Sequence, residues 1–354
     1  MKYLSLAAWV AWMPLATPAA WAQDVGSFTI HEDVLISGEP GTFYEAGVGA
    51  PTVVWDGVNS RYIMIFETPL GTDSRCPVGV WGLGVALSTD GLNWNVAPNP
   101  VVEPTPGDGS YHSCVAAHPS ASFDTASNTM LIFFKGEQGT DACDLETPTW
   151  GCETWTGLGR MLVFLNDDGT VRSRSVSAEP VLTVGQNFGF PKFVEVDGVY
   201  NILFSIYPNI YRATGTTINS LTMDPEPILE PSKTLFWANQ EVFNPAAACE
   251  ASSGFPYVSY FGGRNTSSWL ITDAGWGKAI SASADSGSWF RNENPYFSWG
   301  TESDWRHWEV LLVGSSDHLV FFSEKDATGK PQIRLAYTNP DWDDSQVYDK
   351  RCSL

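Results

Sequence analysis

The sequence has few basic residues: it contains 19 Lys and Arg against 40 Asp and Glu, and its formal net charge is −21. A negative field of this size repels nucleic acids and anionic membranes, so we expect neither as a partner and expect a soluble monomer. The same acidity suits calcium, but no D-x-D-x-D-G loop of the EF-hand type is present. No cofactor is therefore indicated with certainty, and Ca²⁺ is the one ion left open.

Several chemical motifs are missing as well. The sequence has no C-x-x-C, G-x-S-x-G or H-E-x-x-H motif and no glycine-rich phosphate loop. These absences exclude zinc knuckles, thioredoxin-type sites, serine-hydrolase elbows, zincin proteases and common nucleotide sites. No run of about eighteen apolar residues follows the N-terminus, so no transmembrane helix is predicted. No segment has a convincing helical period, whereas 32 Gly, 23 Pro and 16 Trp indicate an ordered, turn-rich chain.

The N-terminus predicts export. Lys2 precedes an apolar run that ends in Ala20-Trp21-Ala22, so residues 1–22 have the features of a secretory signal, although a buried first strand or helix is the alternative. Export places the mature chain, 23–354, in the periplasm or outside the cell, where disulfides form. All 6 Cys lie in the mature chain. We expect the two in one loop to pair, which leaves two further pairs: Cys143–Cys152, then Cys76–Cys114 and Cys249–Cys352.

A pair of strands recurs along the chain. Residues 47–67 read GVGAPTVVWDGVNSRYIMIFE, two apolar runs around a tight turn, and similar pairs follow at intervals of between 54 and 72 residues. Their first strands begin at Pro51, Pro119, Pro191, Pro245 and Glu309. A third strand follows each pair, at 83–89, 160–166, 210–216, 278–284 and 333–339. A turn and a fourth segment then complete each unit.

These units predict an all-β fold, a five-bladed β-propeller with four antiparallel strands in each blade. A flat sandwich is the alternative, but it does not produce so long a period. The last unit lacks its fourth strand, and residues 27–36 alternate without a partner. We therefore expect the N-terminal strand to complete the fifth blade and close the ring, which removes two exposed edges. The mature chain would then be a single propeller domain.

The propeller predicts which residues meet around its axis. The start of each first strand and the end of each second strand lie on one face, because these strands run antiparallel. The first group is Ala50, His118, Phe190, Asn244 and His307 or Trp308. The second group is Glu67, Glu137, Ser205, Gly262 and Glu324. Three long loops surround this pocket face, at 68–80, 136–157 and 263–276, and such loops commonly bind ligands.

Three segments resemble the five-bladed propeller glycosidases: APTVVWDGVNSRYIMIFE, HPSASFDTASNTMLIFF and VALSTDGLNWNVAPNPVVEP. That group includes family 43 arabinanases and xylosidases, family 32-type invertases and levansucrases, and family 130-type mannoside phosphorylases. The resemblance implies a carbohydrate substrate and carboxylate chemistry at the pocket face. It also implies three carboxylates in the family 43 pattern, and the matching positions here hold Ala50, His118 and Gly189. The family 43 catalytic set is therefore absent.

Other carboxylates are candidates for acid and base. Glu309 lies within an inner strand, where burial requires a partner; Arg306 or His307 could supply one, and a purely structural ion pair is the alternative. Glu241 stands before the fourth inner strand. Glu67 ends a second strand on the pocket face, and a solvated strand end is the alternative.

The expected substrate-binding residues are His118, His307, Asn244, Arg306 and Trp305. The two histidines could position a sugar hydroxyl, act as acid and base, or ligate a metal, but the sequence names no third ligand and no metal site is predicted. A hydrogen-bonded core histidine is the alternative. An aromatic face such as that of Trp305 stacks on sugar rings, although packing between blades is commoner.

The sequence therefore predicts an exported glycan-active enzyme, a glycoside hydrolase that acts on a poly- or oligosaccharide through Glu309, Glu241 and Glu67. The alternative is a carbohydrate-binding propeller without catalysis, which would explain the missing acids directly. A third hypothesis is a different reaction at a metal site lined by histidines. Two pocket carboxylates about 5 to 9.5 Å apart would favour hydrolysis over binding alone.

Overall fold

The computed structural model describes most of the mature chain: residues 28–124, 126–138, 156–166, 168, 170–184, 188–249, 255–265, 274–295, 297–299, 307–314, 317–347 and 350–352. These residues are all-β, apart from two 3₁₀ turns, η2 (Phe236–Ala238) and η3 (Asp344–Gln346). In this part of the chain no helix has the length and apolar character needed to cross a membrane. The predicted signal segment lies outside the described residues and stays a prediction.

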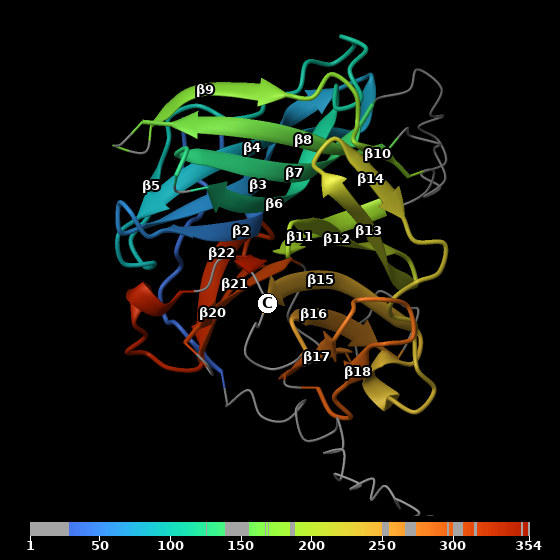
Figure 1. Ribbon diagram of the computed structural model, residues 1–354. Helices are drawn as coiled ribbons and strands as arrows, with labels where there is room; N and C mark the ends of the chain where they lie inside the picture. The colour runs from blue at the N-terminus through green and yellow to red at the C-terminus, as the bar shows by residue number, and fades with distance from the viewer. Residues whose placement is uncertain are drawn as a thin grey trace, which may run out of the picture.

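The strands form four sheets, in which neighbouring strands are mostly antiparallel (Figure 1). The largest sheet contains β2 (Gly49–Asp56), β3 (Arg61–Asp73), β4 (Cys76–Ser88), β5 (Asn95–Val96), β6 (Val115–Asp124), β7 (Thr129–Glu137), β8 (Thr156–Leu165), β9 (Val171–Val176) and β10 (Leu182–Thr183). A single parallel pair, Trp81 with Val115, joins β4 to β6. This sheet therefore divides into two antiparallel units, one from β2 to β5 and one from β6 to β10.

Each of the other three sheets contains one unit of the repeat. The second sheet contains β11 (Phe188–Val196), β12 (Val199–Ile206), β13 (Asn209–Thr217), β14 (Ser220–Met223) and β23 (Arg351–Cys352). The third contains β15 (Glu241–Cys249), β16 (Tyr257–Arg264), β17 (Ala274–Ser281), β18 (Phe290–Arg291) and β19 (Phe297–Trp299). The fourth contains β1 (Thr29–Ile30), β20 (Trp308–Val313), β21 (Asp317–Lys325) and β22 (Pro331–Tyr337).

The first strands of the units contact one another in a closed cycle. β2 touches β6, β6 touches β11, β11 touches β15, β15 touches β20, and β20 touches β2 again. We call these five the inner strands, and the remaining strands of each unit extend outward from them (Figure 1). The N-terminal strand β1 pairs with β22, through Thr29 with Tyr337 and Ile30 with Ala336. The expected pairing of the N-terminal strand with the last hairpin is therefore confirmed.

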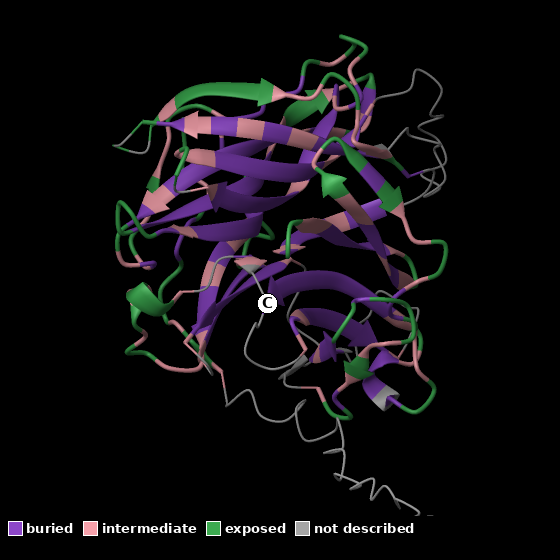
Figure 2. Ribbon diagram, viewed as in Figure 1, coloured by how far each residue is buried: buried purple, intermediate pink, exposed green. Residues whose placement is uncertain are grey.

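The core lies between neighbouring sheets. One cluster packs Phe243 and Tyr260 of the third sheet against Trp308 and Phe322 of the fourth. Successive side chains of a strand point to opposite faces of its sheet. Nearly every residue of an inner strand is buried, so both of its faces pack in the core. Outer strands are exposed, as β9 shows in green in Figure 2. The buried inner strands therefore lie around the axis, and the exposed strands lie outside them.

Four of the inner strands carry the same irregularity at their prolines. The residue before each proline has a positive φ: Ala50 at 42°, His118 at 49°, Phe190 at 57° and Asn244 at 47°. At each of these points the antiparallel register shifts, as it does in a β-bulge. Non-glycine residues rarely adopt this conformation, and a bulge redirects the side chain that it carries. Strained backbone of this kind gathers at functional sites.

One expected loop is wrong. Residues 68–80 were predicted as a pocket loop. In the structure residues 68–73 continue β3 and residues 76–80 begin β4, so the two strands form one long hairpin with its turn at 74–75. The Cys76–Cys114 disulfide, which the sequence predicted, ties this hairpin to the residue that precedes β6. Cys249 is also disulfide-bonded. Cys143 and Cys152 lie outside the described residues, as do most of the other two expected loops.

Candidate functional site

A small cavity opens where the inner strands begin. It is lined by Ala50, His118, Phe190, Lys192, Asn244, Pro245, His307 and Trp308. The bulges direct their side chains to this point, so the residues expected to gather around the axis do meet there. The enclosed space is ≈ 10 Å³, which is room for about one water molecule. We call it the axial cavity.

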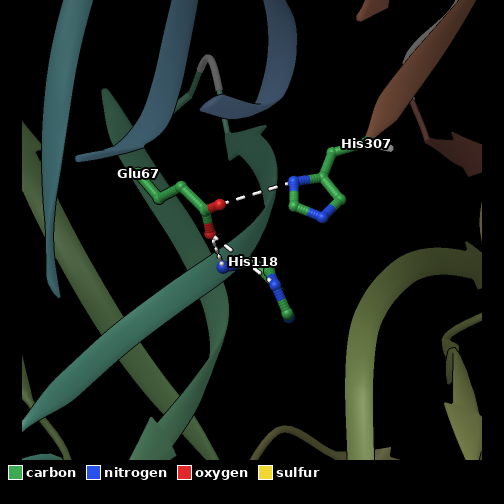
Figure 3. Close-up of side chains that lie close together, drawn as sticks. All are labelled: Glu67, His118 and His307. Atoms are coloured by element: carbon green, nitrogen blue, oxygen red, sulfur yellow. Dashed lines mark hydrogen bonds and ion pairs between the residues drawn. The ribbon is translucent and has the colours of Figure 1, made fainter. Parts of the chain in front are cut away.

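Glu67, His118 and His307 form a cluster beside this cavity (Figure 3). The backbone N–H of His118 donates to Oε2 of Glu67 at 2.9 Å. Nε2 of His118 lies 3.8 Å from the same oxygen, and Nδ1 of His307 lies 3.4 Å from Oε1. Glu67 comes from the middle of β3, His118 from the bulge of β6, and His307 from the residue before β20. Three units of the repeat therefore supply one group each.

Hydrogen-bond partners assign the protons of both imidazoles. The N–H of Phe190 donates to Nδ1 of His118 at 3.3 Å, so that nitrogen is unprotonated and the proton lies on Nε2, which faces Glu67. His307 presents Nδ1 to the carboxylate, so its proton lies on Nδ1. In a neutral His307 the lone pair then lies on Nε2, and Figure 3 shows this nitrogen on the far side of the ring from Glu67.

Burial and charge set the protonation states. Burial alone would raise the pKa of Glu67, but His118, His307 and the His118 amide offset it and lower the pKa to about 2. Burial lowers the pKa of His118 well below its ordinary value, and this outweighs the attraction of Glu67. The ring of Phe190 stacks on His118, with centroids 4.0 Å apart, and shields it from water. At neutral pH the cluster thus holds a charged Glu67 and a neutral His118.

The stability that Glu67 contributes is expected to depend on pH. Its folded pKa is about 2, whereas an unfolded glutamate titrates near about 4.3, so the contribution is complete above about pH 5 and is lost as the pH falls toward 2. The shift corresponds to roughly 3 kcal/mol. We expect the difference in unfolding free energy between wild type and Glu67→Gln, measured with urea, to lose most of this amount between about pH 6 and about pH 2.5.

Glu241 provides the control for this measurement. Burial raises its pKa, partly against the attraction of Arg264. A raised pKa favours the protonated folded form, so the difference between wild type and Glu241→Gln should grow as the pH falls. A Glu67 difference that stays constant or grows with acid would contradict the assigned charge.

The cluster also has the composition of a metal site, but its hydrogen bonds disfavour one. Its donor atoms lie within 4.8 Å of one another, and Glu67 is the third ligand that the sequence did not identify. A metal on Nε2 of His118 would require the proton on Nδ1, which already receives the N–H of Phe190. Calcium fits less well still, because it takes six to eight oxygen ligands.

Glu309 lies in a different environment. It is completely buried in β20, with Lys192 at 2.9 Å and Lys350 at 2.7 Å. Burial would raise its pKa, but the two ammonium groups outweigh burial and lower it. Lys350 also donates to Thr52, so this ion pair connects β20, β11, β2 and the segment before β23. The environment favours the structural alternative, with lysines in place of the partners that the sequence suggested.

Of the remaining predicted site residues, one lies in an ion pair, one lines the cavity and two are not described. Glu241 forms an ion pair with Arg264 of the neighbouring strand. Asn244 lines the axial cavity, and its backbone N–H donates to Ser205. Arg306 and Trp305 lie outside the described residues, so their roles stay predictions.

Two features of the cavity were not predicted from the sequence. Lys192 follows the proline of β11, two residues after Phe190, and was not considered as a cavity residue. The capping of the bulges was missed as well. The N–H of Ala50 donates to Ser323, that of Asn244 to Ser205, and that of His118 to Glu67. Each acceptor directly follows a phenylalanine, in the pairs Phe66-Glu67, Phe204-Ser205 and Phe322-Ser323, and this pattern could have been found.

Comparison with family models and with curated proteins found no match. Solved structures do resemble the chain. A glycosyl hydrolase from Bacteroides ovatus has a TM-score of 0.64 at 12% identity, over 93% of this chain and 97% of that one. A structure reported for the GH130 family of mannoside phosphorylases has a TM-score of 0.61 at 13% identity, over 89% and 94%.

A third structure, β-1,2-mannobiose phosphorylase from Listeria innocua with β-1,2-mannobiose, has a TM-score of 0.57 at 11% identity, over 88% of this chain and 96% of that one. At these identities the likeness concerns the fold alone. The chain thus has the all-β fold found in these glycoside hydrolases and phosphorylases, over nearly their whole length.

Proposed function

We propose that the protein is an exported, glycan-active enzyme, a five-bladed β-propeller glycoside hydrolase that receives its sugar at the mouth of the axial cavity. The closed cycle of inner strands and the likeness to glycosidase structures support the propeller. The Cys76–Cys114 disulfide supports an oxidising compartment, the periplasm or the outside of the cell. We further propose that residues 1–22 are the signal and that 23–354 form one domain.

One observation carries the proposal. Glu67, His118 and His307 come from three units and meet beside a cavity at the axis, in a water-poor setting that suits acid–base chemistry. Of the three carboxylates considered, Glu67 alone contacts groups that can exchange protons with a bound sugar. Glu309 and Glu241 hold lysine and arginine partners instead. The reaction would therefore depend on a carboxylate with two imidazoles and not on a pair of carboxylates.

A panel of poly- and oligosaccharides tests this function. We expect the oxidised mature protein to release products from at least one glycan, detected by chromatography. Glu67→Gln should lower kcat/KM on that glycan by about 10²- to 10⁴-fold, the usual contribution of acid–base catalysis. Glu324→Gln is the matched control, because Glu324 lies on a second strand next to Ser323 and pairs with Arg334. Equal activity of Glu67→Gln and wild type would contradict the assignment.

A second function is favoured by a separate observation. Two of the three candidate carboxylates are held in ion pairs. A propeller that binds a carbohydrate without cleaving it would need no free carboxylate at either of these positions. That protein would bind a glycan of the panel saturably in calorimetry and yield no product from any of them.

A further inference from the structure

The two histidines stand between Glu67 and the cavity. His118 and His307 line the axial cavity, and their side chains are 16% and 18% exposed. The Glu67 side chain is 6% exposed and is not among the lining residues. A water in the cavity, or a sugar hydroxyl that enters it, would therefore meet an imidazole first. Glu67 can act on it only through a histidine.

The two histidines are not equivalent. Both ring nitrogens of His118 face protein groups, since Nδ1 accepts from Phe190 and Nε2 faces Glu67. His307 uses Nδ1 for Glu67, and no hydrogen bond or ion pair within the described residues engages its Nε2. Figure 3 shows this nitrogen turned away from the carboxylate. In its neutral form His307 is thus the imidazole whose lone pair, on Nε2, can accept a proton.

We infer that His307 is the general base of the reaction and that Glu67 is its positioning residue. The inference rests on the proposed function and gives its site an order of events. Nε2 of His307 takes the proton of a water or sugar hydroxyl in the axial cavity, and an N–H bond forms as the O–H bond breaks. The proton on Nδ1 remains between His307 and Glu67, and the carboxylate stabilises the resulting imidazolium.

The charges around His307 suit this role. Glu67 from β3 is negative and in direct contact, whereas His118 from β6 is neutral at pH 7. Lys192 from β11 also lines the cavity, and it shares the carboxylate of Glu309 with Lys350, so this group keeps one net positive charge. Asn244 from β15 and Trp308 carry no charge. The charged group in direct contact with the ring of His307 is the Glu67 carboxylate, which favours a positive charge on that ring.

The repeat supplies a matched variant for the test. Ser205 and Ser323 accept the bulge amide at positions equivalent to Glu67, so Glu67→Ser keeps an acceptor for His118 and removes the carboxylate. We expect this variant to fold. Glu324→Gln, which leaves the cluster untouched, is again the control.

Nitrogen-15 NMR of the labelled protein at neutral pH tests the dyad without any substrate. In wild type and in Glu324→Gln, we expect His307 to show the Nδ1–H tautomer and His118 the Nε2–H tautomer, assigned with His307→Gln and His118→Gln. Glu67→Ser should shift His307 toward the Nε2–H form. An Nε2–H tautomer of His307 in wild type, or no change in Glu67→Ser, would overturn the inference.

A glycan found active in the panel adds a second measurement. His307→Gly should lose about 10²- to 10⁴-fold in kcat, with a smaller change in KM, and added imidazole should restore part of the loss. If the panel yields no product while the tautomers are as expected, the proposed function fails and the dyad stands. If product forms and imidazole restores nothing, the role of His307 as base fails.

Discussion

Glu309→Gln is expected to lower the free energy of unfolding by about 3 to 5 kcal/mol, the usual effect of removing one partner of a buried ion pair. The substitution leaves Lys192 and Lys350 buried with their charges uncompensated. A buried ammonium group without a counter-charge must either lose its proton or draw in water, and both cost stability. Urea unfolding monitored by tryptophan fluorescence measures the loss.

A triple variant separates charge from packing. Lys192→Met, Glu309→Leu and Lys350→Met together replace all three groups with apolar side chains, and such replacements are often neutral or stabilising. We expect the triple variant to recover most of the stability that Glu309→Gln loses. If Glu309→Gln is as stable as wild type, this ion pair does not stabilise the fold. Glu309 would then again be a candidate for the catalytic acid.

Removal of the Cys76–Cys114 disulfide should have an effect of similar size. The bond closes a loop with a sequence separation of 38, for which the chain-entropy relation gives about 4 kcal/mol. We expect Cys76→Ser with Cys114→Ser to lose about this amount in urea unfolding. The bond also fixes the β3–β4 hairpin, which carries Glu67, to the start of β6, which carries His118. The double variant should therefore also show altered tautomers at His118 and His307.

The control for this experiment is a single substitution at a second position of the same hairpin. Val78→Ser lies on β4 close to Cys76 and is exposed, so its stability should remain within about 0.5 kcal/mol of wild type. A double cysteine variant as stable as this control would mean that the hairpin is held by its other contacts alone.

The repeat itself could be read from the sequence, because it is written in short-range patterns. Alternating apolar runs, tight turns and recurring prolines predicted the strands, the pairing of the N-terminal strand and the meeting of Ala50, His118, Phe190 and Asn244. Each of these features follows from the direction of a strand. The outward extension of β3 and β4 was missed, because residues 68–80 contain proline and glycine and lack the alternation of the inner part.

The ion-pair partners of the buried carboxylates could not be predicted from such local patterns. Glu309 was given Arg306 or His307, its neighbours in sequence, and the structure supplies lysines from β11 and from the segment before β23. These contacts depend on how far apart two strands of different units lie, which no local pattern encodes. The histidine neighbours of Glu67 could not be predicted for the same reason, since they come from two other units.

One position in the repeat holds different residues in the five units. The residue paired with the start of each of the four bulges is Glu67, Lys135, Ser205 or Gly262, and Ser323 holds the matching place in the fifth unit. The serines and the glutamate accept a bulge amide. A backbone N–H that already points at this position lowers the cost of placing an anion there. A glutamate introduced at Ser205 or Ser323 would therefore meet a backbone N–H that already donates to that position, so these two positions suit the design of a second buried carboxylate.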